Sequence, residues 1–121
     1  MPPKYPVRYV DPHFADRLRT LPRDAQAAVL TLLGRVANGE LQLGQPCGYQ
    51  HRTGNLDDCR KLYFDVALDR RPTYRLIYRV LPDEGRPASI DAITVGPKYT
   101  YDAAGNRDTI YARVGELLDR I

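Results

Sequence analysis

Two segments decide the fold: residues 60–68 read RKLYFDVAL, and residues 74–81 read YRLIYRVL. Both are rich in β-branched and aromatic residues, which is typical of strands. Residues 89–95, SIDAITV, have the same character. The breaks at 69–72 and 82–87 are short and polar. We therefore expect three consecutive strands that form an antiparallel meander.

Helices are predicted before and after this meander in the sequence, where apolar side chains recur at helical spacing. The first begins at Asp11-Pro12, a capping residue followed by a proline that favours the first helical turn, and ends near residue 20. The second covers residues 22–38 and ends at Asn38-Gly39. The third covers residues 107–120, with Asn106 as its cap.

The remaining segments complete the predicted element order. Residues 5–10 alternate weakly and are expected to form a first strand, while residues 39–58 and 96–105 are expected to be loops. The order is then β-α-α-β-β-β-α, an α+β pattern. We expect a single domain over residues 1–121, with a helical hairpin packed on one face of the antiparallel meander sheet and the other face open.

Strand alternation separates the side chains of the first two meander strands into two sets. The apolar set, expected to face the helices, is Leu62, Phe64, Val66, Leu76, Tyr78 and Val80. The opposite set is Lys61, Tyr63, Asp65, Arg75, Ile77 and Arg79. The second set predicts a basic, aromatic surface that water or a nucleic acid can reach.

This surface has two interpretations. It is a solvated sheet face, on which Asp65 pairs with an arginine of the next strand, or it is a site that acts on RNA. Cleavage of RNA at its own 2′-hydroxyl needs a base, positive charge on the phosphorane and a proton donor for the leaving oxygen. Lysine, arginine and tyrosine supply all three without histidine, metal or cofactor, and tyrosine also stacks on unpaired bases.

Charge and composition are consistent with an anionic partner. Residues 51–79 carry seven Lys+Arg against four Asp+Glu, while the chain as a whole has a net charge of +3.

Residues 1–6 lack the apolar stretch of a signal peptide, so a cytoplasmic protein without a membrane segment is expected. Cys47, His51 and Cys59 match no standard zinc spacing, so no metal site is predicted. His13 and His51 are the alternative acid–base candidates.

Four short motifs resemble the RelE/ParE superfamily of bacterial type II toxins, in the order found there. They are LDDCRKL at 56–62, YRLIYRV at 74–80, ITVG at 93–96 and RDTIY at 107–111. The resemblance covers nearly the whole chain and implies the RelE-like fold. It also implies a toxin that cuts mRNA on the ribosome, and a cognate antitoxin as partner.

The resemblance also implies roles for individual residues. Lys61 matches a catalytic lysine, Arg75 a phosphate-binding arginine, and Tyr111 a tyrosine that stacks on the substrate. Tyr63 stands where a second lysine is expected. After Gly96, only Lys98 is close behind, and an insertion at 100–105 separates it from Arg107, so either residue takes the place of the family's late arginine, or neither does. The predicted catalytic residues are Lys61, Arg75, Tyr111 and Lys98, and the predicted RNA-binding residues are Tyr63, Arg79, Arg60 and Arg107.

The leading hypothesis is therefore an endoribonuclease toxin that acts on ribosome-bound mRNA. The alternatives are a ParE-like inhibitor of DNA gyrase without nuclease activity, and a degenerate member that only binds its antitoxin. The long last helix and the absence of the second strand lysine favour the gyrase inhibitor, whereas the Lys–Tyr–Arg face favours the nuclease.

Overall fold

The computed structural model describes residues 4–50, 54–64, 74–82, 84–101 and 104–120. Its helices are α1 (Phe14–Arg19), α2 (Arg23–Ala37) and α3 (Ile110–Leu117). Its strands are β1 (Val7–Tyr9), β2 (Gln45–Gln50), β3 (Gly54–Phe64), β4 (Tyr74–Leu81), β5 (Ser89–Pro97), β6 (Tyr99–Tyr101) and β7 (Arg107–Thr109). The predictions for His51, Asp65, Val66 and residues 67–72 lie outside the described residues.

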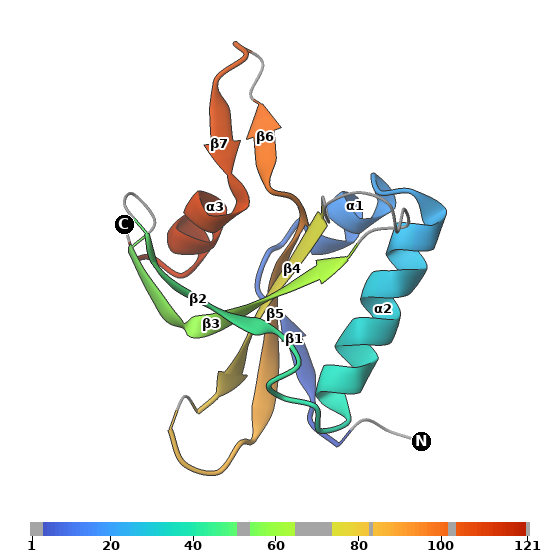
Figure 1. The fold of residues 1–121 in the computed structure, drawn as a ribbon, viewed down its shortest axis with the longest axis vertical. Helices are drawn as coiled ribbons and strands as arrows, with labels where there is room; N and C mark the ends of the chain where they lie inside the picture. Colours follow the sequence, from blue (N-terminus) through green and yellow to red (C-terminus); the bar gives the residue numbers. More distant parts are fainter. Residues whose placement is uncertain (1–3, 51–53, 65–73, 83, 102–103, 121) are drawn as a thin grey trace.

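Five strands form the main sheet, in the order β1-β5-β4-β3-β2 (Figure 1). The predicted meander is confirmed: β3 pairs with β4, and β4 pairs with β5, in antiparallel orientation. β1 joins the far edge and runs parallel to β5. The register places Tyr63 opposite Arg75, and Arg75 opposite Gly96. This register determines which side chains meet on the sheet surface.

The first face of the sheet is covered by α1 and α2, as predicted. Leu62, Phe64, Leu76 and Tyr78 are buried there against Val29, Leu33 and other apolar residues of the helices. Their alternate positions follow the period of two along β3 and β4. The α+β class, with a helical hairpin on an antiparallel sheet, is confirmed.

The second face is not left open, which corrects the sequence-based expectation. Helix α3 packs on it, on the opposite side of the sheet from α2 (Figure 1). The apolar residues beneath α3 include Leu56, Ile77 and Ile93, all fully buried. Residues 90–96 of β5 are buried without interruption because helices cover both faces of that strand. On this second face of the sheet, only the part that α3 and the core beneath it do not cover is accessible to a ligand.

Three strands were not predicted. β2 and the first half of β3 lie in residues expected to form a loop, and their pairing is interrupted between Pro46 and Gly48. Glycine is required at the start of β3, because a Cβ on Gly54 would lie 2.4 Å from the carbonyl oxygen of Arg120. The other two strands, β6 and β7, pair with each other and form a ribbon that stands away from the body of the protein (Figure 1).

The third helix begins later and ends earlier than predicted. It covers Ile110–Leu117, and its cap is Thr109, whose hydroxyl accepts a hydrogen bond from the backbone N–H of Ala112 at 3.1 Å. Residues 107–109 are instead taken up by β7, so the predicted cap Asn106 precedes a strand. The predicted long C-terminal helix is therefore wrong.

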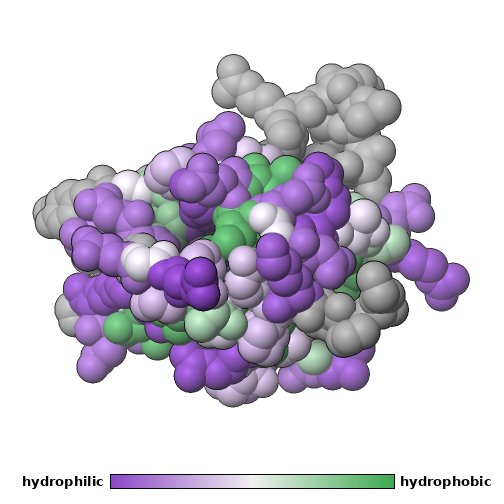
Figure 2. All heavy atoms as spheres, turned by 90° about the horizontal axis from the view of Figure 1, so that it is seen from below, coloured by the Kyte–Doolittle hydropathy of each residue, from purple (hydrophilic) through white to green (hydrophobic). Residues whose placement is uncertain are grey.

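The face seen in Figure 2 is mainly hydrophilic. Seen from the end opposite the ribbon, polar side chains dominate, and apolar side chains form small, interrupted spots (Figure 2). Among the described residues, no helix has the length and apolar character needed to span a bilayer.

Candidate functional site

Lys61, Tyr63, Arg75 and Tyr111 come together on the second face of the sheet, and we call them the basic–aromatic cluster. The Lys61 ammonium nitrogen lies 5.7 Å from the ring centroid of Tyr63 and 5.6 Å from that of Tyr111. The Arg75 guanidinium carbon lies 4.8 Å above the Tyr63 ring. Arg75 Nε donates a hydrogen bond of 3.0 Å to the Tyr111 hydroxyl. Two cations and two phenols thus share one surface.

Three elements position this cluster. Lys61 and Tyr63 are two residues apart on β3, so both point to the same face. Arg75 is the direct cross-strand partner of Tyr63 on β4. Tyr111 comes from the first turn of α3, where helix packing brings its ring over the sheet. The predicted gathering of Lys61, Tyr63 and Arg75 is what the structure has, and Tyr111 joins them.

Three side chains surround the phenol of Tyr63. Arg75 donates a hydrogen bond to the Tyr111 hydroxyl and stacks on the Tyr63 ring, and Lys61 lies near both rings. Burial alone would raise the pKa of Tyr63, but the hydrogen bond and charge of Lys61, the hydrogen bond from Tyr111 and the charge of Arg75 outweigh it. The pKa of Tyr63 is therefore lowered from its usual value near 10. The cluster thus makes the phenolate of Tyr63 easier to form than that of an ordinary tyrosine.

Tyr111 has the opposite tendency. Its side chain is buried, and this burial raises its pKa to about 12, although the charge and hydrogen bond of Arg75 act against the shift. The neighbouring Tyr63 adds to the increase. Tyr111 therefore remains protonated across the whole physiological range. The two phenols differ in role although they belong to the same residue type.

Arg79 does not join the cluster, contrary to the expectation. Its Nε donates to the buried carboxylate of Asp91 at 3.0 Å, and its Nη1 lies 3.6 Å from Asp58. The Arg79 side chain is only 17% exposed. Between Arg75 and Arg79 on the same face lies the fully buried Ile77, which separates the two arginines. Arg79 serves to neutralise carboxylates in the fold.

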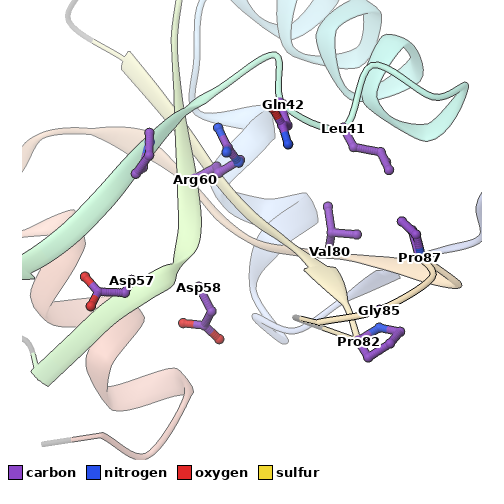
Figure 3. Close-up of a pocket in the computed structure, with 10 residues that line it drawn as sticks. Leu41, Gln42, Asp57, Asp58, Arg60, Val80, Pro82, Gly85 and Pro87 are labelled. Atoms are coloured by element: carbon purple, nitrogen blue, oxygen red, sulfur yellow. The ribbon is translucent and has the colours of Figure 1, made fainter.

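Arg60 also lies outside the cluster, because it is on the opposite face of β3 from Lys61. Its Nη1 donates to the carbonyl oxygen of Gly44 at 2.5 Å. It lines a cavity of about 270 Å³ with Asp57, Asp58 and residues of the loops at 41–46 and 82–87 (Figure 3). In this view Arg60 is directed toward Gln42, away from the two aspartates. The expected RNA-binding position of Arg60 is not supported by this placement.

Lys98 and Arg107 lie at the ribbon rather than within the cluster. The Lys98 ammonium nitrogen is 5.2 Å from the ring centroid of Tyr99, and the Arg107 guanidinium carbon is 4.5 Å from it. The carbonyl of Lys98 accepts a hydrogen bond from the N–H of Ile110, which ties the ribbon to the start of α3. The structure therefore places both candidates for the late arginine together, beside a different aromatic ring.

Arg113 is a further cation that sequence reasoning missed. It lies on α3, two residues after Tyr111, and its Nη1 donates to the Thr94 hydroxyl at 3.1 Å. The same nitrogen lies 3.8 Å from the position of a Cβ at Gly96, the residue opposite Arg75. Burial and the charge of Arg17 lower its pKa. The sequence shows that Arg113 follows Tyr111 by two residues. It does not show that the Arg113 guanidinium approaches Gly96, where no side chain is in its way.

The other titratable candidates are not in the cluster. His13 is exposed and precedes α1. Cys47 and Cys59 are buried in the core beneath α3 as free thiols, and burial raises the pKa of Cys47 to about 11. Among the described residues, no group of three or more His, Cys, Asp or Glu side chains is arranged to hold a metal ion.

Comparison with known proteins finds a structural neighbour for this fold. The sequence matches no protein-family model and no curated protein. The structure is similar to the crystal structure of the toxin–antitoxin complex RelBE2 from Mycobacterium tuberculosis, with 26% sequence identity and a TM-score of 0.52. The match covers 80% of this chain and 93% of that chain. Together with the four motifs and the helical hairpin on an antiparallel sheet, this similarity shows a RelE-like fold and supports a toxin role for the chain.

Proposed function

We propose that this chain is an endoribonuclease toxin that cuts mRNA on the ribosome, and that the basic–aromatic cluster is its active site. One observation carries the proposal: Lys61 and Arg75 lie 5.7 and 4.8 Å from the ring centroid of Tyr63, and Arg75 also holds the Tyr111 hydroxyl by a hydrogen bond. A phenol that is stabilised as an anion between two cations is suited to take a proton beside a phosphate. A solvated sheet face does not require this arrangement.

The reaction assigned to this site is an internal transfer within the RNA. The Tyr63 phenolate takes the proton of a 2′-hydroxyl, and that oxygen forms a bond to the adjacent phosphorus. Arg75 stabilises the negative charge of the phosphorane, since its planar guanidinium fits two phosphate oxygens. The bond from phosphorus to the 5′ oxygen breaks, and the Lys61 ammonium donates a proton to this leaving oxygen. The products are a 2′,3′-cyclic phosphate and a 5′-hydroxyl.

The direct test of this function is to map mRNA ends by primer extension after the protein is expressed. We expect new 5′ ends within translated messages, at positions that disappear when translation initiation is blocked. If growth stops while messages remain intact, the nuclease proposal is wrong. Supercoiling by purified gyrase, measured with the protein added, then identifies the gyrase inhibitor.

The gyrase interpretation has lost one of its two supports. It was favoured by a long last helix, but α3 covers only Ile110–Leu117. The remaining support is the absence of a second strand lysine, and Tyr63 occupies that position with a lowered pKa. Tyr63 is thus a chemical replacement for that lysine, because both side chains accept a proton when deprotonated.

A change at Tyr63 should alter the pH dependence of cleavage. We expect Tyr63→Phe to lower the single-turnover rate by about a hundredfold, since a positioned base contributes at least this much. In the wild type the rate should rise with pH until Tyr63 is fully ionised, because only the phenolate is active. The lowered pKa places this rise below the ordinary value near 10.

The rise should be absent in Tyr63→Phe. Tyr74→Phe is the matched control, because Tyr74 stacks on Phe64 with ring centroids 5.6 Å apart and is not part of the cluster. An unchanged pH profile in Tyr63→Phe would remove Tyr63 from the role of base and leave Lys61 as the candidate.

We also propose a cognate antitoxin as the binding partner. The similar Mycobacterium structure is a complex of a toxin with an antitoxin. An acidic segment of such a partner would neutralise the paired charges of Lys61 and Arg75 and exclude RNA from them. Co-expression with the product of the adjacent open reading frame should give a stable complex, and separate elution of the two proteins would contradict this.

A further inference from the structure

The β6–β7 ribbon is an unusual structural element in this chain. Two-stranded ribbons have little stability of their own, because they bury few side chains. This one stands away from the sheet and carries two large exposed aromatics, Tyr99 at 38% and Tyr101 at 66% exposure (Figure 1). They are two of the four large hydrophobic residues found exposed in the described part of the chain. Folding gains little from these rings, so their exposure calls for another explanation.

The two tyrosines share one face of the ribbon with a cation. Tyr99 and Tyr101 alternate along β6, and Arg107 lies directly opposite Tyr101 on β7. The Arg107 guanidinium carbon lies 4.5 Å from the centroid of the Tyr99 ring, and the Lys98 ammonium nitrogen lies 5.2 Å from it. Thr100 and Asp108 form the next cross-strand pair and point to the other face. The result is a pair of rings bordered by two positive charges.

The ribbon is joined along both of its strands to elements that carry or flank the basic–aromatic cluster. Gly96, opposite Arg75, is followed three residues later by Tyr99, and Thr109 at the end of β7 is followed two residues later by Tyr111. At about 3.3 Å per residue, Tyr99 lies roughly 10 Å along the chain from Gly96 and Tyr101 roughly 17 Å from it. A strand of RNA held at Arg75 can therefore reach both rings.

We propose that this ribbon is a stacking arm for the substrate RNA: unpaired bases that flank the cleaved position stack on Tyr99 and Tyr101, while Lys98 and Arg107 contact their phosphates. The inference rests on the proposed function, since it takes the strand bound at Arg75 as its starting point. Exposed aromatic rings beside cations are the common means of holding single-stranded nucleic acid without sequence preference. The positive charges of Lys98 and Arg107 beside the rings favour an anionic strand as the occupant.

The test uses two labelled RNAs with 2′-O-methyl groups, which cannot be cleaved: a trinucleotide that fills the cluster and a nonanucleotide that also reaches the ribbon. Binding is measured by fluorescence anisotropy at fixed salt. We expect Tyr99→Ala/Tyr101→Ala to weaken nonanucleotide binding by at least tenfold and to leave trinucleotide binding unchanged, since each stacked base contributes about a factor of ten. Arg75→Ala should weaken binding of both RNAs.

Two further variants separate stacking from folding. Tyr99→Phe/Tyr101→Phe should bind the nonanucleotide as the wild type does, because the ring is retained. Tyr9→Ala, a change at another exposed tyrosine, which packs on Phe14 of α1, should have no effect on either RNA. Arg107→Ala should reduce the salt dependence of nonanucleotide binding by about one phosphate contact.

Different negative results would reject different proposals. If Arg75→Ala weakens both RNAs but the double alanine variant binds the nonanucleotide normally, the stacking arm is wrong and the active site remains. The arm is also wrong if the double variant loses affinity only for intact ribosomes or only for the antitoxin. If the wild type binds neither RNA, the proposed function itself fails.

Discussion

Replacing Arg75 with alanine is expected to lower the rate of mRNA cleavage by about a hundredfold to a thousandfold, the cost of removing one donor that stabilises charge in a transition state. Growth arrest on expression should disappear with it. Arg75 contacts both tyrosines, through its stacking on Tyr63 and its hydrogen bond to Tyr111. Under the proposed function, its loss removes a phosphate ligand and also one of the charges that lower the pKa of Tyr63.

Two controls make this result interpretable. Arg75→Lys retains the charge but not the planar fork, so we expect partial activity between the wild type and the alanine variant. Arg75 is half-buried rather than exposed, and its hydrogen bond is lost in the alanine variant, so a stability cost of about 1 kcal/mol is expected. Circular dichroism during urea unfolding measures that cost. A folded Arg75→Ala protein that cleaves at the wild-type rate would exclude Arg75 from catalysis.

The largest effect on stability is expected at Asp11, far from the chemistry. Its side chain is 1% exposed and accepts hydrogen bonds from His13 N at 2.8 Å, Arg17 Nε at 2.6 Å and the Thr94 hydroxyl at 2.8 Å. Arg113 donates to the same Thr94 hydroxyl, so this carboxylate connects α1 and β5 with α3. Removing one partner of a buried ion pair costs about 3 kcal/mol, and Asp11→Ala should lower the Tm by roughly 10–15 °C.

The matched control for Asp11→Ala is Asp16→Ala. Asp16 pairs with Arg19 on the same helix, but both side chains are about 70% exposed, so the change should cost no more than about 0.5 kcal/mol. If the two variants unfold at the same urea concentration, Asp11 does not hold the three elements together.

Acid should remove the contribution of Asp11 in a defined range. Burial tends to raise its pKa, but the hydrogen bonds from His13, Arg17 and Thr94 outweigh it and lower the pKa below 3.8. The carboxylate therefore stabilises the fold fully above its unfolded pKa, and this stabilisation is lost as the pH falls through the lower folded value. The difference in unfolding free energy between wild type and Asp11→Ala should narrow in that range.

Much of the site could be predicted because it depends on local rules. The period of two assigned Lys61, Tyr63 and Arg75 to one face, and the pairing of β3 with β4 sets Tyr63 opposite Arg75. The same rule could not show which of these cations would find carboxylates. Arg79 has the same alternation as Arg75, but Asp91 lies next to it on β5 and Asp58 is close on β3. Such long-range ion pairs depend on the tertiary fold.

The covering of the second face was missed for a related reason. Ile77 was grouped with Arg75 and Arg79 by alternation, and its apolar side chain was an isolated exception. In the fold it meets Ile93 and Ile110 beneath α3, and all three are fully buried. An apolar residue in an otherwise polar set was thus the signal for a second core, which also brings Tyr111 over the cluster. The sequence alone suggested Tyr111 only through the family resemblance.

If the basic–aromatic cluster cleaves RNA through the 2′-hydroxyl of the substrate, removing this one oxygen from the message should prevent cleavage. Ribosomes are programmed with a message that carries one 2′-deoxyribose at the mapped cleavage position, and the products are compared with those of the all-ribose message. We expect the all-ribose message to be cut to a 2′,3′-cyclic phosphate and a 5′-hydroxyl, while the deoxy-substituted message stays intact. Cleavage of the substituted message at the same position would show that the reaction does not use the 2′-hydroxyl.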